Sequence, residues 1–180
     1  MLRIHVPDQE YFDNKLGEFI YAKGGDIALE HSLFAVWRWE SKWKKPFLSK
    51  NPPKTREESI YYIYCMIEEG SVDYLALAAL PDETIDIIDQ YMNDSMTATT
   101  FSKTNEPPSR EVITAEVLYW EMFELGIPLE FEHRHLNHLM TLIKVCSIRN
   151  SPNKKMSKSE IFNRNRAINE YNKKRYHTKG

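Results

Sequence analysis

Apolar and polar residues alternate at the very start of the chain, where the apolar positions are Leu2, Ile4 and Val6. This period of two is typical of a half-buried strand, which Pro7 ends. Two more short apolar runs, residues 18–22 and 26–29, flank a glycine pair that a turn explains. Residues 1–30 therefore predict a small β-hairpin or meander.

Helical periodicity dominates from residue 31 onward, and polar or proline-containing breaks divide it into segments. The predicted helices cover residues 31–44, 55–70, 71–80, 81–92, 109–125 and 130–147. The second helix opens with Thr55 and Glu58, which have the spacing of a capping box, and Gly70 is expected to close it. Ser109 is expected to cap the fifth. Residues 93–108 are rich in Thr, Ser, Asn and Pro and predict a long loop.

A second capping box, from Ser157 to Glu160, predicts a last helix that begins near Lys158. Its apolar side is thin and consists of Ile161, Phe162, Ile168 and Tyr171. A helix with so narrow an apolar stripe gains little from packing on its own domain. We therefore expect a detachable amphipathic helix that docks on a partner, although charged runs at chain ends are usually only solvated.

Together these patterns predict a mainly α fold. A single helical domain covers residues 1–148 and includes the small β-hairpin or meander of residues 1–30. A basic extension, residues 149–180, carries one helix.

Composition supports a globular chain, since 42% of the 180 residues are hydrophobic and 28% are charged. No apolar run approaches the roughly 20 residues of a membrane span, and no secretory signal is expected at the N-terminus. Cys65 and Cys146 both lie in apolar helical patterns, where cysteine acts as a small hydrophobe, and a reducing cytoplasm is the expected compartment.

Charge is unevenly distributed along the chain. From Arg149 to the end there are ten lysines and arginines against Glu160 and Glu170, a net charge of +8. Residues 1–148 hold 14 basic and 24 acidic residues, a net charge of −10. This asymmetry indicates that the basic extension contacts something acidic: a neighbouring copy, a partner protein or nucleic acid.

Two groups of residues have side chains that could bind a metal ion. His133, His135 and His138 form an H-x-H-x-x-H string, but on a helix the first two point about 200° apart, so surface or interface histidines are the simpler interpretation. A second group is acidic, comprising Asp82, Glu83, Asp86 and Asp89, and is more simply the solvated face of a helix. Motifs for phosphate binding or nucleophilic catalysis are absent. We therefore expect no catalytic, cofactor or metal site.

Three tryptophans within seven residues make residues 37–48 the most unusual segment. Its large aromatic residues are Trp37, Trp39, Trp43 and Phe47. They cannot all face one side of a helix, so at least one ring should be partly exposed. Three interpretations remain open: a core helix with large residues, a protein-binding surface, and stacking on single-stranded nucleic acid. The candidate partner-binding residues are these four, the apolar side of the last helix, and the basic residues Arg164, Arg166, Lys173, Lys174 and Arg175.

Several strings of residues resemble those of a family of tailed-bacteriophage proteins, in the same order and over nearly the whole chain. The strings are Leu29-Glu30-His31-Ser32-Leu33, Trp39-Glu40-Ser41-Lys42-Trp43, Lys45-Pro46-Phe47-Leu48, Met96-Thr97-Ala98-Thr99-Thr100-Phe101, His135-Leu136-Asn137, Leu142-Ile143-Lys144-Val145-Cys146 and Lys154-Lys155-Met156-Ser157. These proteins belong to the tail-morphogenesis region and look like tail assembly chaperones.

The resemblance implies a partner, the tape measure protein, whose long helical chain must stay soluble until tail protein polymerises around it. It also implies contacts with other tail proteins in the host bacterial cytoplasm, and it supplies no catalytic residues. A chaperone for a long amphipathic helix needs exposed apolar surface and no active site. A structural tail or neck component of the virion would need much the same features, and a nucleic-acid-binding phage protein is a weaker alternative.

Overall fold

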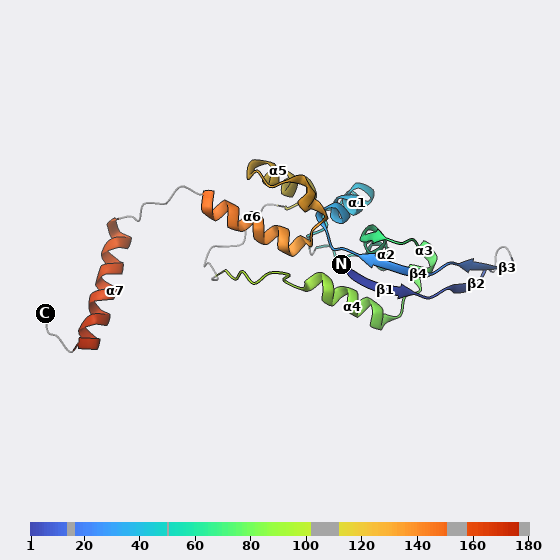
Figure 1. Cartoon of the computed structure of the whole chain (residues 1–180), viewed down its shortest axis with the longest axis horizontal. Coiled ribbons are helices and arrows are strands. Elements are labelled where there is room, and N and C mark those ends of the chain that lie inside the picture. The colour runs from blue at the N-terminus through green and yellow to red at the C-terminus, as the bar shows by residue number, and fades with distance from the viewer. Residues whose placement is uncertain (14–16, 50, 102–111, 151–157, 177–180) are drawn as a thin grey trace. The chain divides into compact units, whose positions relative to one another are not determined.

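The computed structural model describes residues 1–13, 17–49, 51–101, 112–150 and 158–176 (Figure 1). The chain forms two compact units, Met1–Cys146 and Ser147–Gly180, and each is described by itself. Helices predominate, and antiparallel strands occupy the N-terminal region, so the fold is mixed rather than purely helical. The expectation of a helix-rich fold with N-terminal strands is confirmed in this form. No helix in the described part of the chain has the length and apolarity of a membrane span.

The N-terminal strands form a long hairpin in two parts. β1 (Leu2–Val6) pairs antiparallel with β4 (Gly25–Leu29), and β2 (Gln9–Asp13) pairs antiparallel with β3 (Glu18–Ala22). The pairing continues beyond Pro7, where an end was expected, so β2 is an addition to the prediction. Pro7 interrupts the ladder because it has no N–H to donate. At this joint the N–H of Gly24 instead donates to Asp8 Oδ1 at 2.7 Å.

A further strand, β5 (Ile67–Glu69), pairs antiparallel with β4 and gives a sheet in the order β1-β4-β5. The prediction that a helix runs to Gly70 is therefore wrong. α2 (Arg56–Cys65) ends at Met66, whose carbonyl accepts the N–H of Glu30 at 2.8 Å. Pairing with β4 thus takes the chain out of the helix, although the spacing of the apolar residues continues. The capping box at Thr55 and Glu58 is confirmed.

Gly70 ends the strand rather than the helix. Its φ of +85° is a conformation that side-chain-bearing residues rarely adopt, and an added Cβ would lie 2.3 Å from the carbonyl oxygen of Asp26. The tight approach of this turn to β4 therefore requires glycine.

α1 (Leu33–Trp43) contacts α2, α5 (Ala115–Glu124) and the short 3-10 helix η1 (Leu129–His133). It begins after Ser32, whose hydroxyl accepts the N–H of Ala35. Its buried positions pack into one core with β4, α2 and α6 (Leu136–Asn150). The largest fully buried side chains are Trp39, Tyr62, Leu29, Leu33, Met66, Leu77, Ile88, Met122, Leu136 and Leu139.

The remaining helices of this unit are α3 (Tyr74–Ala78) and α4 (Asp82–Asn93). Pro81 lies at the N-cap of α4, so the helix begins one residue later than predicted. α5 begins at Ala115, after Thr114, and not at residue 109; Ser109 lies outside the described residues. Both cysteines are free, Cys65 buried and Cys146 half-buried.

The single helix predicted over residues 130–147 is divided into η1 and α6, with Arg134 in an extended conformation between them. His135 forms an antiparallel bridge with Ser32, and the N–H of Leu136 donates to the carbonyl of His31 at 2.6 Å. Contact with a segment about a hundred residues earlier thus breaks the helix, which local periodicity does not reveal.

In the second unit, α7 (Lys158–Tyr176) begins where the sequence predicts. Ser157, the expected cap, lies outside the described residues.

Candidate functional site

Two of the aromatic residues proposed as a partner surface are part of the core. Trp39 is 1% exposed, and its indole N–H donates to the carbonyl of Glu58 at 2.8 Å. Phe47 is 6% exposed and stacks on Tyr62, with ring centroids 4.0 Å apart. The prediction that Trp39 contacts a partner is therefore wrong, because the hairpin of α1 and α2 encloses its ring, whereas Phe47 keeps a small part of its ring accessible.

The other two tryptophans are more accessible. Trp37 is 41% exposed and stacks on Phe34, while Trp43 is half-buried against Tyr61. The ammonium of Lys42 lies 3.7 Å from the centroid of the Tyr61 ring, which is cation–π geometry. The indole nitrogen of Trp43 is buried and has no hydrogen-bond partner among the described residues. Trp37 and Trp43 thus stay candidates for partner contact.

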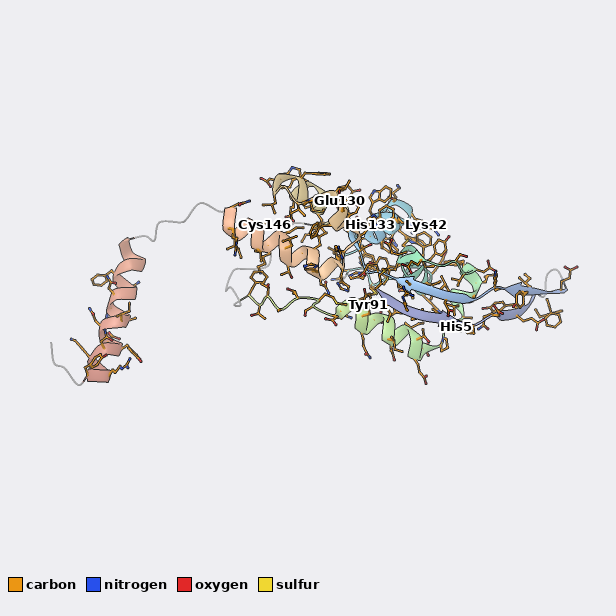
Figure 2. All side chains as sticks on the ribbon, viewed as in Figure 1. His5, Lys42, Tyr91, Glu130, His133 and Cys146 are labelled. Atoms are coloured by element: carbon orange, nitrogen blue, oxygen red, sulfur yellow. The ribbon has the colours of Figure 1, made fainter. Side chains whose placement is uncertain are left out.

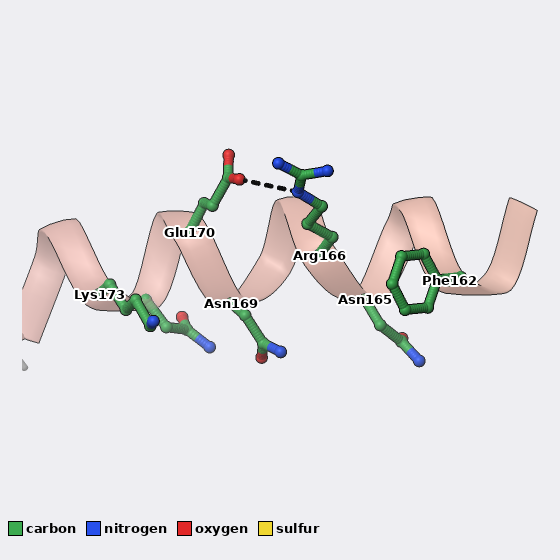
Figure 3. Close-up of a pocket in the computed structure, with 7 residues that line it drawn as sticks. Phe162, Asn165, Arg166, Asn169, Glu170 and Lys173 are labelled. Atoms are coloured by element: carbon green, nitrogen blue, oxygen red, sulfur yellow. Dashed lines mark hydrogen bonds and ion pairs between the residues drawn. The ribbon is translucent and has the colours of Figure 1, made fainter. Parts of the chain in front are cut away.

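The apolar side chains of α7 are exposed on that helix. Phe162 is 68% exposed, Tyr171 62% and Ile168 45%. Figure 3 shows Arg166 joined to Glu170, with a distance of 3.2 Å from Nε to the carboxylate. The side chains drawn there line a shallow furrow on the surface of α7 alone, and one helix does not enclose a cavity. Lys173 and Arg175 are exposed as well. The side chains of Ile161, Arg164 and Lys174 lie outside what the structure describes.

A further exposed apolar surface lies on α5 and was missed by the sequence analysis. Trp120 is 61% exposed and Phe123 is 63% exposed. They are three positions apart, so they are neighbours on the helix surface, opposite the side that buries Leu118 and Met122. We call Trp120 and Phe123 the α5 aromatic pair. Its signal was available in the sequence, since apolar residues surround this helix on more sides than one core-facing stripe requires.

A second missed surface is the tip of the N-terminal hairpin. Phe12 and Phe19 are directly opposite each other across β2 and β3, with ring centroids 5.1 Å apart, and are 52% and 68% exposed.

The hydroxyl of Tyr21 donates to Asp8, and this bond, more than the Gly24 N–H, lowers the pKa of Asp8 below its usual value.

The three histidines of the H-x-H-x-x-H string do not converge. His135 is 6% exposed, so its assignment to the surface is wrong; it packs edge-to-face on His31 and Tyr91. His133, labelled in Figure 2, is half-exposed, and its Nδ1 lies 3.3 Å from the carboxylate of Glu68. His138 is exposed. Among the described residues, no group of three or more His, Cys, Asp or Glu side chains is placed to hold a metal ion.

His31 packs against the ring of His135 and is 5% exposed. Its Nδ1 is 2.5 Å from the hydroxyl of Tyr62. Burial, and secondarily the neighbouring His135, lowers the pKa of His31 to about 3, so the ring is neutral at physiological pH. On the other side of His135, the Tyr91 hydroxyl donates to Glu30 at 2.6 Å, and burial followed by this bond raises the pKa of Tyr91. The cluster ties β4 and α4 to the start of α6.

The acids of α4 form no site. Asp82 and Glu83 occupy its first turn, where they complement the helix dipole. Asp89 is two turns further on, and burial, more than its neighbour Asp86, raises its pKa.

No protein-family model, curated protein or solved structure matches this chain.

Proposed function

We propose that this protein is a bacteriophage tail assembly protein, a chaperone that binds the tape measure protein in the host bacterial cytoplasm. The observation that supports it best is the α5 aromatic pair, two large apolar side chains that are each more than 60% exposed on one helical face. Trp and Phe side chains held on a rigid helix are frequent anchors in protein interfaces. The resemblance of the sequence to tail assembly chaperones supplies the identity of the partner.

Binding, rather than catalysis, is the mode of action proposed. The buried titratable groups have contacts that join elements of the fold. Glu40 accepts the N–H groups of Phe47 and Ala115, and Glu58 contacts Lys45 and the backbone of Thr55. Such contacts give these carboxylates structural roles.

The partner contact is tested by co-expression with the tape measure protein of the encoding phage. We expect wild-type protein to hold that chain in the soluble fraction and to co-purify with it. The double variant Trp120→Ser, Phe123→Ser should retain its thermal melt but lose about tenfold or more in affinity, since two central anchors are removed. Leu75→Ser, which removes an exposed apolar side chain from α3, is the matched control. Unchanged co-purification of the double variant would contradict the proposal for this surface.

Mass spectrometry of purified virions separates the chaperone from the structural alternative. A chaperone is expected in infected cells and not in particles, whereas a tail or neck component would be present at fixed copy number. A nucleic-acid-binding protein would instead show an affinity that falls steeply as the salt concentration rises, because its lysines and arginines displace counterions from the phosphates of the nucleic acid.

A further inference from the structure

A cleft of about 710 Å³ lies in the first unit between α2, α4, the loop before α2 and the start of α6. Its volume falls in the roughly 300–1,000 Å³ range of ligand sites in proteins. The walls are mainly apolar, formed by the buried Phe47, Ile60, Ile63 and Leu136 and by the half-buried Leu48, Ile85 and Met92. A cleft of this kind accommodates several apolar side chains at once.

Two cations line the cleft beside this apolar wall. The ammonium of Lys54 lies 4.3 Å from the centroid of the Phe47 ring, and no described carboxylate forms an ion pair with it. Burial lowers the pKa of Lys54, with Glu58 acting against this at longer range. Arg56 is exposed, and its guanidinium reaches the carbonyl of Ala78 at 3.4 Å. Both cations are therefore open to an anionic group that enters the cleft.

The charges of the residues that line the cleft indicate which kind of segment it would bind. Among the residues that the structure describes, the charged groups that line the cleft are Lys54, Arg56 and one carboxylate, Asp89, since His31 is neutral. An apolar segment that carries an acidic residue matches this pattern, because its carboxylate would approach Lys54 while its apolar side chains fill the wall. The basic C-terminal segment of a second copy does not match, since ten of its residues carry the same sign as Lys54 and Arg56.

We infer that this cleft binds an amphipathic helix of the partner protein, with the apolar face against Ile85 and Met92 and an acidic residue against Lys54. The inference rests on the proposed function, in which the partner is a long helical chain, and it specifies where one segment of that chain docks. The mode is that of a helix in a groove, in which apolar anchors give affinity and a flanking charge fixes the register.

The test measures binding of two synthetic fluorescein-labelled amphipathic helices to the full chain by fluorescence anisotropy. The peptides share one leucine face; the flanking positions carry glutamate in one and glutamine in the other. Lys54→Gln should weaken binding of the glutamate peptide by about tenfold and leave binding of the glutamine peptide within about twofold. Only the glutamate peptide carries a carboxylate that Lys54 can attract. Ile85→Glu should weaken both peptides by about tenfold or more, since it places a charge in the apolar wall.

Each variant has a matched control. Ile87→Glu lies on the same helix as Ile85 but is 50% exposed and outside the cleft, and Lys23→Gln removes an exposed lysine elsewhere. Both should bind like wild type. Asp89→Lys, an exposed position on the cleft wall, adds a cation and should strengthen the glutamate peptide severalfold. This gain keeps the test decisive if Ile85→Glu fails to fold.

The outcomes separate the cleft from the proposed function. If the peptides bind wild type and the cleft variants change nothing, the cleft is not the docking site, while helix binding by another surface stands. If neither peptide binds wild type, the cleft inference is overturned, and co-purification with the tape measure protein decides the proposed function by itself. Dodecanoate, an apolar chain with one carboxylate, is the competing ligand. Lys54-dependent binding of dodecanoate without peptide binding would make this a small-amphiphile site and overturn the inference.

Discussion

The carboxylate of Glu40 accepts the backbone N–H of Ala115 at 2.8 Å, so that the end of α1 holds the first residue of α5. The two residues are 75 positions apart. Thr114, the N-cap of α5, makes no side-chain capping bond, and Glu40 supplies an acceptor for the first turn in its place. The position of the α5 aromatic pair relative to the core therefore depends on a side chain from another helix.

Replacing Glu40 with glutamine should lower the free energy of unfolding by about 1–3 kcal/mol. The two carboxylate oxygens accept the N–H groups of Phe47 and Ala115, and a carboxamide offers one acceptor where two are needed. Urea denaturation measures the change. Glu116→Gln, at an exposed position in the first turn of α5, should change stability little. Equal stability of both variants would show that the Glu40 bonds contribute nothing.

Stability should fall as the pH drops below about 6.5, with His31 responsible for part of the slope. Its pKa is about 3 in the folded chain and 6.5 when unconstrained, so between these values the unfolded state binds the extra proton. The slope from one such group is at most about 1.4 kcal/mol per pH unit. Urea denaturation of His31→Asn from pH 7 to pH 4 should show a flatter profile than wild type. His138→Asn, at an exposed position, should keep the wild-type slope.

Trp39 and Trp37 should respond differently to the same substitution. Trp39→Ala should cost about 3–5 kcal/mol, because it opens a cavity in the core and leaves the Glu58 carbonyl without its donor. Trp37→Ala should cost about 1 kcal/mol or less, since the ring is partly exposed and loses mainly its stacking on Phe34. Thermal and urea melts of the two variants decide the matter. Similar losses in the free energy of unfolding would show that the difference in burial between the two rings does not affect stability.

Gly70→Ala should destabilise more than Gly126→Ala. Both glycines have positive φ, +85° and +67°, and alanine in such a conformation costs about 1–2 kcal/mol. At Gly70 the added Cβ would also lie 2.3 Å from the carbonyl oxygen of Asp26, whereas nothing lies within 4 Å at Gly126. The difference between the two variants in urea therefore isolates the steric part. A smaller loss at Gly70 would show that β5 moves easily away from β4.

Ending the chain after Asn150 should leave the first unit folded. The buried core residues among those described extend no further than Ile143. We expect the melting temperature to stay within about 2 °C of that of the full chain, which corresponds to less than about 1 kcal/mol. The same truncation should weaken self-association or co-purification with tail proteins. A large drop in melting temperature would mean that the C-terminal helix belongs to the core.

Much of the secondary structure follows from local sequence pattern and could be predicted from it. The alternation at Leu2, Ile4 and Val6 lies in β1, the capping box begins α2 and Lys158 begins α7. Local pattern does not predict the structure where contacts with distant segments compete with local periodicity. Ile67 has helical spacing yet lies in β5 because β4 provides a partner strand, and His135 lies outside a helix because Ser32 pairs with it.

The candidate partner surface could be predicted only in part, because the tertiary fold decides which aromatic rings are buried. The spacing of the tryptophans showed that they could not share one face, but which ring is buried depends on α2, which covers Trp39 and leaves Trp37 accessible. The α5 aromatic pair could have been recognised from the excess of apolar residues around its helix. The cleft could not, since its walls come from segments that only the tertiary fold brings together.

The unequal burial of the two free cysteines gives the chain a natural labelling position. Cys65 is 1% exposed, and burial raises its pKa to about 11, so at neutral pH it stays a thiol shielded from reagents. Cys146 is half-buried and is the last residue of the first unit. A maleimide dye should therefore attach at the junction of the two units without any engineered cysteine. Its fluorescence would report on the arrival of a partner at the end of the first unit.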